Sequence, residues 1–250
     1  MEKKFTLGII GAGNMASAIL GGVLRGGLLP AGSIIISDRD GEKLAVMAQN
    51  GVAVTADNKE VAASCEYLMF AVKPQIAPAV FAEIAPVIKA GTVISIMAGV
   101  PVAKLRAALG ERNYVRVMPN TPALVGEGMS AVAFADGVRS QFVLDVFASV
   151  GKVAELDESK FDAVTSLSGS GPAYVYMFLK ALIDGGVEGG LDPETAKLLA
   201  VQTVRGSAKM AGMSSKPLGE LIDAVCSKGG TTIQAVESFR EDDLEGIVRK

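Results

Sequence analysis

Short, fully apolar runs alternate with amphipathic, helix-like stretches through the first 150 residues of the chain. The apolar runs that read as strands cover residues 5–10, 34–37, 52–55, 67–72, 92–96 and 114–118. Helix-like stretches lie between them at 42–49, at 76–88 and up to Leu109. Continuous apolar strands interleaved with helices are typical of a mainly parallel sheet that is covered on both faces. With right-handed crossovers, this pattern predicts a doubly wound α/β fold.

The pattern changes near residue 157, where strand-like runs stop. Long helical stretches follow at 172–187, 193–210 and 218–225, and the first of these is apolar on most of its sides. A helix that is apolar all round is normally buried, and a domain of about 90 residues is small to bury one alone. We therefore expect a first domain of residues 1–157 and an all-helical domain of residues 158–250 that shares its core with a second subunit.

The first apolar run leads directly into a glycine-rich turn and a helix. Residues 8–16 read GIIGAGNMA, which contains the pattern GxGxxA at Gly11, Gly13 and Ala16. In dinucleotide-binding folds, the first glycine permits a tight turn and the second lets the backbone approach a pyrophosphate. The N-terminus of the following helix offers N–H groups and a positive dipole end to the same anion. The first domain is therefore predicted to bind a dinucleotide, against the alternative of a glycine-rich turn in another α/β unit.

Composition and charge narrow the class of protein. Half of the 250 residues are hydrophobic, as in a globular chain, and the formal net charge is −3 without blocks of like charge. We therefore expect no nucleic-acid partner and no membrane-surface partner. No apolar run reaches the length of a membrane-spanning helix, and no signal peptide is predicted, so we expect a cytoplasmic protein. Cys65 and Cys226 are expected to be buried, reduced thiols that bind no metal.

The chain contains no histidine. The commonest general acid–base and metal ligand near neutral pH is therefore missing, and a Ser–His or Cys–His nucleophile is excluded. Any chemistry must depend on a cofactor or on a substrate that carries its own proton.

Three loops that end predicted strands are candidates for contact with the cofactor. Ser37, Asp38 and Arg39 follow the second strand, where an acidic residue favours a ribose 2′-hydroxyl and Ser or Arg favours a 2′-phosphate. The loops 71–74 and 98–101 follow two apolar strands, and ligands of open α/β sheets lie outside such carboxyl ends. A solvated turn at residue 38 and an ordinary surface role for Lys73 remain alternatives.

Two further loops combine rigid or exposed backbone with polar side chains. Residues 118–122 read MPNTP, which indicates a loop of fixed shape with either a structural or a ligand-binding role. Residues 227–232 read SKGGTT and open a helix. Exposed N–H groups and two threonine hydroxyls there favour a carboxylate or phosphate site, against a pair of helix caps.

Together these motifs resemble the pyrroline-5-carboxylate reductases over residues 5–239. The most specific match runs from Leu218 through the SKGGTT turn to Glu237, with support from AVKP, AGV, MPNTPALVGEGM and SGSGPAYVY. The resemblance implies a Rossmann-like N-terminal domain, a C-terminal helical dimerisation domain, and a homodimer or a larger oligomer built of dimers.

The resemblance also implies roles for individual residues. The pyrophosphate would be held by Gly11, Ala12, Gly13, Asn14 and Met15, the 2′-phosphate by Ser37 and Arg39, and the adenosine would lie by Asn58. The nicotinamide half would lie along Ala71, Val72, Lys73, Pro74, Ala98 and Gly99. The substrate would be bound by Ser227, Gly229, Gly230, Thr231, Thr232 and Glu158, with Thr232 as the catalytic residue beside the ring nitrogen. For Glu158, a negative charge at a helix start is an equally good interpretation.

The implied reaction is hydride transfer from NADP(H), with NAD(H) as the alternative, to the C=N bond of 1-pyrroline-5-carboxylate, which gives L-proline. Because an iminium accepts hydride without a strong enzymic acid, this chemistry suits a chain without histidine. Two alternatives remain at this point. A β-hydroxyacid dehydrogenase-like reductase would need a catalytic lysine, for which Lys180 is the candidate, and a nucleotide-sensing binding protein would show no turnover.

Overall fold

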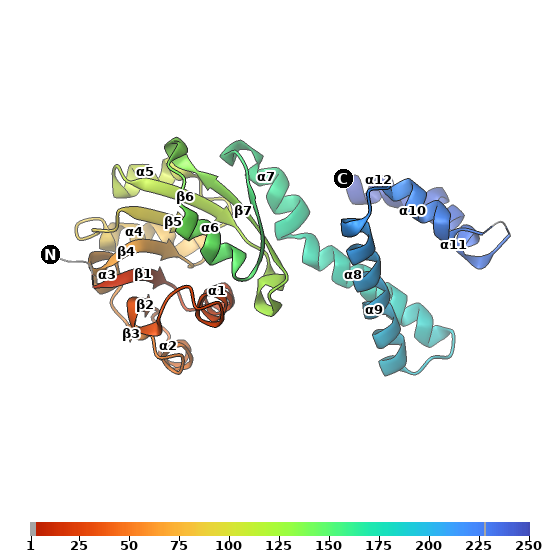
Figure 1. Ribbon diagram of the computed structural model, residues 1–250, viewed down its shortest axis with the longest axis horizontal. Coiled ribbons are helices and arrows are strands. Elements are labelled where there is room, and N and C mark those ends of the chain that lie inside the picture. Colours follow the sequence, from red (N-terminus) through yellow and green to blue (C-terminus); the bar gives the residue numbers. More distant parts are fainter. Residues whose placement is uncertain (1–3, 228) are drawn as a thin grey trace. The chain divides into compact units, whose positions relative to one another are not determined.

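A computed structural model describes residues 4–227 and 229–250 of the chain. The Cα positions divide it into two compact units, Met1–Tyr174 and Val175–Lys250. The first unit is built around a sheet of eight strands in the order β3-β2-β1-β4-β5-β6-β7-β8 (Figure 1). The strands are β1 Phe5–Ile10, β2 Ile34–Ser37, β3 Ala53–Thr55, β4 Cys65–Phe70, β5 Thr92–Ser95, β6 Asn113–Met118, β7 Gly128–Phe134 and β8 Gly151–Glu155.

Helices cover both faces of this sheet, as the sequence pattern predicts. The helices of the first unit are α1 Asn14–Arg25, α2 Gly41–Ala48, α3 Asn58–Ser64, α4 Ala77–Ile84, α5 Val102–Leu109, α6 Gln141–Ala148 and α7 Phe161–Val164. One core joins the sheet to α3, α4 and α5, and a second core joins its other face to α1, α2 and α6. The doubly wound α/β prediction is therefore confirmed.

The last two strands run against the first six. Strands β1 to β6 pair in parallel, β7 pairs antiparallel with β6 through Val115–Phe134 and Met118–Ala131, and β8 runs parallel to β7. The connection from β6 to β7 holds only the 3₁₀ segment Thr121–Val125. A parallel return needs a crossover of a dozen or more residues, so the short connection forces the reversal.

Several element boundaries differ from the expectation. The helix expected at 76–88 ends at Ile84. Ala85 still has helical backbone angles, but Pro86 has no backbone N–H with which to continue the helical hydrogen bonds. Strand β4 begins at Cys65 and ends at Phe70, two residues before the predicted strand's end at Val72. The elements α3, α6, β7 and β8 are not among the predicted ones.

The second unit is all-helical. Its helices are the end of α8 Gly171–Glu188, then α9 Pro193–Met213, α10 Leu218–Val225, α11 Thr231–Glu241 and α12 Leu244–Arg249. Asp192 caps α9 by accepting a hydrogen bond from the Thr195 N–H at 3.1 Å. Among the described residues of this unit, only Ala196 and Ala200 are buried apolar side chains. No helix in the described part of the chain could cross a membrane.

Candidate functional site

The glycine-rich turn after β1 has a backbone that only glycine fits. Gly11 has φ +105°, and a Cβ added there would lie 2.7 Å from the carbonyl oxygen of Ala71. A side chain would therefore meet both a strained backbone and a steric clash. The turn is thereby held against the end of β4, where the Ala71 N–H also donates to the Ile10 carbonyl at 2.9 Å.

Helix α1 presents an uncapped N-terminus at this turn. Its N-cap is Gly13, which has no side chain to cap the helix, and its first turn holds no acidic residue. A Cβ added at Gly13 would meet nothing within 4 Å, so the space above the turn is open. The N–H groups near Asn14 and Met15 thus face an open volume at the positive end of a helix, an arrangement that fits the pyrophosphate of a dinucleotide.

The carboxylate of Asp38 is directed at the glycine-rich turn. One oxygen, Oδ2, accepts the Ala12 N–H at 2.7 Å, and the other, Oδ1, accepts the Asp40 N–H at 3.0 Å. The neighbouring Arg39 is exposed and makes no ion pair within the part of the chain that the structure describes. Asp38 therefore fixes backbone, and the Arg39 guanidinium remains available for an anion such as a 2′-phosphate.

A cavity of about 280 Å³ lies at the carboxyl ends of β1 and β2. It is lined by Ile10, Gly11, Ser37, Asp38, Arg39, Asn58, Val72, Gln75, Ile76, Ala79 and Val80. The structure thus brings together five of the predicted cofactor residues, namely Gly11, Ser37, Arg39, Asn58 and Val72. Mixed apolar and polar walls of this kind suit the adenosine half of a dinucleotide.

A chain of buried hydrogen bonds forms one wall of this cavity. Ser37 is fully buried and donates its hydroxyl to Asn58 Oδ1 at 2.8 Å, while Asn58 Nδ2 donates to Glu83 Oε2 at 3.0 Å. Because the Ser37 proton is already used, this hydroxyl can meet a ligand only as an acceptor. The sequence pattern did not point to Glu83, which lies near the C-terminal end of α4.

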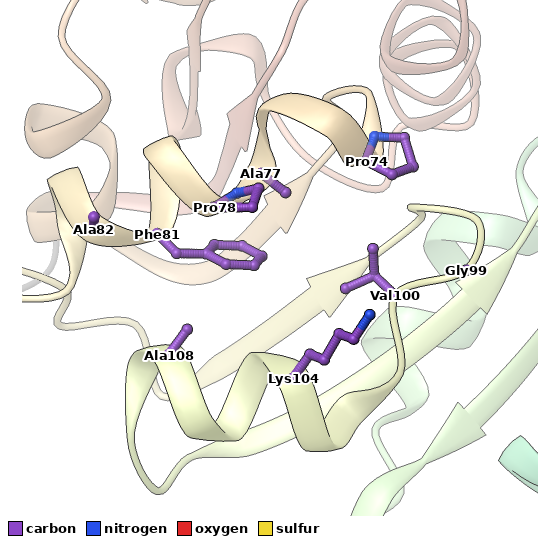
Figure 2. A pocket seen from close by; sticks show the side chains of 9 residues that line it. All are labelled: Pro74, Ala77, Pro78, Phe81, Ala82, Gly99, Val100, Lys104 and Ala108. Carbon is purple, nitrogen blue, oxygen red and sulfur yellow. The ribbon is translucent and has the colours of Figure 1, made fainter.

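The other predicted cofactor residues lie along the same edge of the sheet. Pro74 and Gly99 line a separate groove of about 530 Å³ between α4 and α5, whose walls are largely apolar. Figure 2 shows Phe81 from α4 facing this groove, with Val100 and Lys104 on its opposite side. Ala71 is half-buried, Ala98 and Lys73 are exposed, and no ion pair involves Lys73 among the described residues.

Glu158 lies in the first unit, at the start of the short 3₁₀ segment Glu158–Lys160. Its Oε1 accepts the Val102 N–H at 2.8 Å and also pairs with Arg116 Nη1 at 3.0 Å. Arg116 comes from β6, is buried, and lies with its guanidinium carbon 4.8 Å from the ring centre of Phe161. The negative charge therefore lies at the start of the 3₁₀ segment that Glu158 begins, and the same carboxylate also lies at the start of α5.

The turn predicted to bind substrate lies in the second unit, just before α11. Within it, Lys228 lies outside the described residues. Helix α11 begins at Thr231 with Gly230 as N-cap, and no side chain makes a capping hydrogen bond. The alternative in which this turn is a pair of helix caps, with a capping role for Thr231, is therefore not supported at α11, because Gly230 occupies the N-cap position.

This turn keeps its polar groups available. Neither threonine hydroxyl has a hydrogen-bond partner within the described chain. A Cβ added at Gly230 would lie 2.4 Å from the Ser227 hydroxyl oxygen, so a larger residue there would displace that hydroxyl. Exposed N–H groups at a helix start, next to three hydroxyls, form a good binding site for a carboxylate.

Two other sequence expectations concern isolated residues. Lys180 is the candidate catalytic lysine of the β-hydroxyacid dehydrogenase-like alternative. It pairs with Asp184 on the surface of α8, and this hydrogen bond raises the pKa of the lysine. Cys65 is buried as expected, whereas Cys226 is only partly buried because it follows the exposed end of α10. No group of side chains among the described residues could hold a metal ion.

Asn120 is a further polar residue at this edge, and the sequence left its role open between structural and ligand-binding. Its Oδ1 accepts the Met129 N–H at 2.9 Å, and its Nδ2 donates to the Ser168 carbonyl at 3.2 Å. It thereby ties the MPNTP loop to β7 and to the π-helical turn Thr165–Gly169. These contacts favour the structural role.

Comparison with known proteins agrees with both halves of this description. The model for the family described as pyrroline-5-carboxylate reductase dimerisation matches residues 158–250. The model described as NADP oxidoreductase coenzyme F420-dependent matches residues 6–99. Residues 6–99 contain the glycine-rich turn, and residues 158–250 contain the turn before α11.

Full-length relatives are similarly consistent. The chain is 38% identical to the pyrroline-5-carboxylate reductase of Pisum sativum, covering 99% of this chain and 92% of the relative. It is 40% identical to that of Escherichia coli strain K12, covering 99% and 94%. A crystal structure of Plasmodium falciparum pyrroline carboxylate reductase with NADP bound superposes with a TM-score of 0.88 at 34% identity, covering 100% and 94%. The chain belongs to the pyrroline-5-carboxylate reductase family.

Proposed function

We propose that this protein reduces 1-pyrroline-5-carboxylate to L-proline with NADP(H), the last step of proline biosynthesis. The observation that carries the proposal is the open, uncapped N-terminus of α1 above Gly13, together with an Arg39 that has no ion-pair partner among the described residues, in a chain of this family. Residues 1–157 would form the dinucleotide-binding domain and residues 158–250 the substrate and dimerisation domain.

The chain's own residues would bind and orient the two reactants. NADPH, when bound, supplies the hydride that the C=N carbon accepts. The N–H groups of α1 hold the pyrophosphate, and Arg39 pairs with the 2′-phosphate. Ala71, Val72, Ala98 and Gly99 border the nicotinamide half at the carboxyl ends of β4 and β5.

The turn 227–232 would fix the substrate. Its backbone N–H groups bind the ring carboxylate, and the Thr232 hydroxyl lies by the ring nitrogen. Since the protonated imine already carries the proton that the product amine retains, no histidine is required. The protein then accelerates the reaction through proximity and the placement of charge.

The second unit would assemble as a homodimer, or as a larger oligomer of dimers. Support comes from large apolar side chains on α8 and α9 that are exposed in the single chain, including Tyr176, Met177, Phe178, Leu198 and Met210. Exposed apolar surface of this extent marks a protein interface. The assembled enzyme would work in the cytoplasm.

A single absorbance assay tests the activity. Adding 1-pyrroline-5-carboxylate should oxidise NADPH and form proline in equal amounts, with NADH run in parallel. Binding of NADPH without any turnover would instead favour the nucleotide-sensing alternative. Lys180→Ala should retain full activity. A variant that loses activity would instead favour the dehydrogenase-like mechanism, in which Lys180 is catalytic.

A further inference from the structure

The loop that borders the proposed nicotinamide site is held at both ends. It joins β5 to α5, and its Ala98 and Gly99 are exposed while Met97 and Val100 are buried in the core. At its start, the Ile96 N–H donates to the Phe70 carbonyl at 3.2 Å. The position of the exposed part therefore depends on how firmly the first turn of α5 is fixed.

Helix α5 lacks any cap of its own. Its N-cap is Pro101, which makes no side-chain cap hydrogen bond, and its first turn holds no acidic residue. Glu158 supplies both missing features from 56 residues away, because its Oε1 accepts the Val102 N–H at 2.8 Å. A carboxylate at this place satisfies one backbone donor and complements the helix dipole.

Arg116 holds this carboxylate in place. Its guanidinium is buried on β6 and lies between Glu158 and the ring of Phe161. β6 is a central strand, paired with β5 and β7. The arrangement therefore links the first turn of α5 to the rigid centre of the sheet through a single carboxylate oxygen.

We propose that Glu158 is a positioning residue, which fixes the loop 96–101 through α5 and so aligns the nicotinamide ring for hydride transfer. The proposal rests on the proposed function, which places the nicotinamide along this loop. In this proposal Glu158 acts by accepting the Val102 N–H while Arg116 holds its carboxylate, and it does not contact the substrate.

Four variants separate positioning from substrate contact. Glu158→Ala removes the cap and the charge, whereas Glu158→Gln keeps an oxygen that can accept the Val102 N–H. Val102→Pro removes the N–H that donates to Glu158 but keeps the charges of Glu158 and Arg116. The helix should tolerate this change, because proline is favourable at the first position of a helix. Val102→Ala is its matched control, because it shortens the side chain but retains the N–H.

We expect Glu158→Ala and Val102→Pro each to lower kcat by about tenfold or more, which is at least 1.4 kcal/mol of lost transition-state stabilisation. The deuterium isotope effect from labelled NADPH should rise, while the KM of the pyrroline changes little. Glu158→Gln and Val102→Ala should stay within about threefold of wild type. Glu155→Gln, which breaks the exposed pair with Arg139, should have no effect.

A direct substrate contact gives a different pattern. The KM of the pyrroline would then rise in both Glu158→Ala and Glu158→Gln, and Val102→Pro would behave as Val102→Ala does. That pattern would overturn the proposal.

Hydrogen exchange on the NADPH-bound protein tests the loop without turnover. Amides of residues 96–100 should exchange faster in Glu158→Ala and Val102→Pro than in wild type or Val102→Ala, while amides of the central strands exchange as in wild type. Unchanged exchange of residues 96–100 in both variants would refute the positioning role, whatever their activity. If the wild-type protein does not reduce the pyrroline, the proposed function is refuted. The exchange experiment still tests whether Glu158 fixes the loop, because it needs no turnover.

Discussion

The two compact units of this chain bury their side chains to different degrees. In the first unit, both faces of the sheet are covered, and aromatic residues such as Phe70 and Phe147 are fully buried. In the second unit, α8 has no buried residue, and Phe178 is 44% exposed. The first unit therefore has a complete core, whereas the second presents apolar surface that only a further copy of the chain or another partner can cover.

The two units also differ in whether the polar side chains of their proposed sites have hydrogen-bond partners. Asp38, Asn58 and Glu158 of the first unit are all engaged in hydrogen bonds that shape the cofactor edge. The hydroxyls of Thr231 and Thr232 in the second unit have no partner within the described residues. The comparison suggests that the dinucleotide site is preformed in the single chain and that the substrate turn gains its partners later.

The largest effect should come from a matched pair of core and surface aromatics. Phe70→Ala removes a buried ring that packs edge-on against Phe81 with centroids 5.1 Å apart, so we expect a loss of about 3–5 kcal/mol in the free energy of unfolding. Phe178→Ala should mainly weaken assembly, raising the dimer dissociation constant and making Tm more dependent on protein concentration. Urea unfolding and sedimentation would measure the two effects. An unchanged dissociation constant in Phe178→Ala would argue against α8 as the contact.

The next effect concerns the open space above Gly13. Gly13→Val places a branched side chain where nothing lies within 4 Å, which is the volume that the pyrophosphate needs. We expect NADPH affinity to fall by well over tenfold while Tm stays near wild type. Fluorescence titration of NADPH measures the affinity. Normal binding by the folded variant would refute the assignment of this turn.

A change in the second unit should affect the substrate and not the cofactor. If the Thr232 hydroxyl binds the substrate nitrogen, Thr232→Ala should lower kcat/KM for the pyrroline by about 10- to 100-fold, the worth of one hydrogen bond to a charged group. NADPH affinity should remain normal. Thr231→Ala is the comparison variant: its hydroxyl makes no capping bond, so Tm should change little, and its loss of kcat/KM should be smaller than that of Thr232→Ala. Equal kinetic losses in both variants would contradict a specific role for Thr232.

Cofactor preference tests the polar edge of the first unit. Arg39→Ala should weaken NADPH binding by about tenfold, because a charge-assisted bond to the 2′-phosphate is lost. NADH binding should change little, since Asp38 is engaged by the turn and does not depend on Arg39. Equal losses with both cofactors, measured by titration, would show that Arg39 does not read the phosphate.

The features that depend on local backbone could be predicted from the sequence, and those that depend on distant pairing could not. Gly11 and Gly13 identify their turn because the required conformation and open space belong to a few consecutive residues. Strand β7 consists largely of small residues, and the residues of β8 are half-buried or exposed, so neither has the apolar pattern of a buried strand. The sequence indicated that Glu158 places a negative charge at a helix start. It could not indicate the partners Val102 and Arg116, because they lie 56 and 42 residues away.

The smallest effect comes from two helix caps, one in each unit. Asp40 caps α2 by accepting the N–H groups of Glu42 and Lys43, and Asp192 caps α9 by accepting that of Thr195. The hydrogen bond with the Lys43 backbone is the largest cause that lowers the pKa of Asp40 below 3.8. For Asp192, the largest cause that lowers the pKa is the interaction with the Thr195 side-chain hydroxyl, followed by the bond with the Thr195 backbone N–H. Because the folded pKa is depressed, each carboxylate stabilises the protein above its unfolded pKa, and this contribution is lost as the pH falls through the folded value.

Asparagine retains the cap but does not titrate, so Asp40→Asn and Asp192→Asn should resemble wild type in cap geometry and differ in acid sensitivity. The Tm advantage of wild type over each variant should be present at neutral pH and disappear as the pH falls below 3.8. If the units unfold separately, Asp40→Asn should shift only the transition of the sheet unit and Asp192→Asn only that of the helical unit. A single calorimetric transition shifted by both variants would mean that the two units, despite their unequal cores, unfold as one cooperative structure.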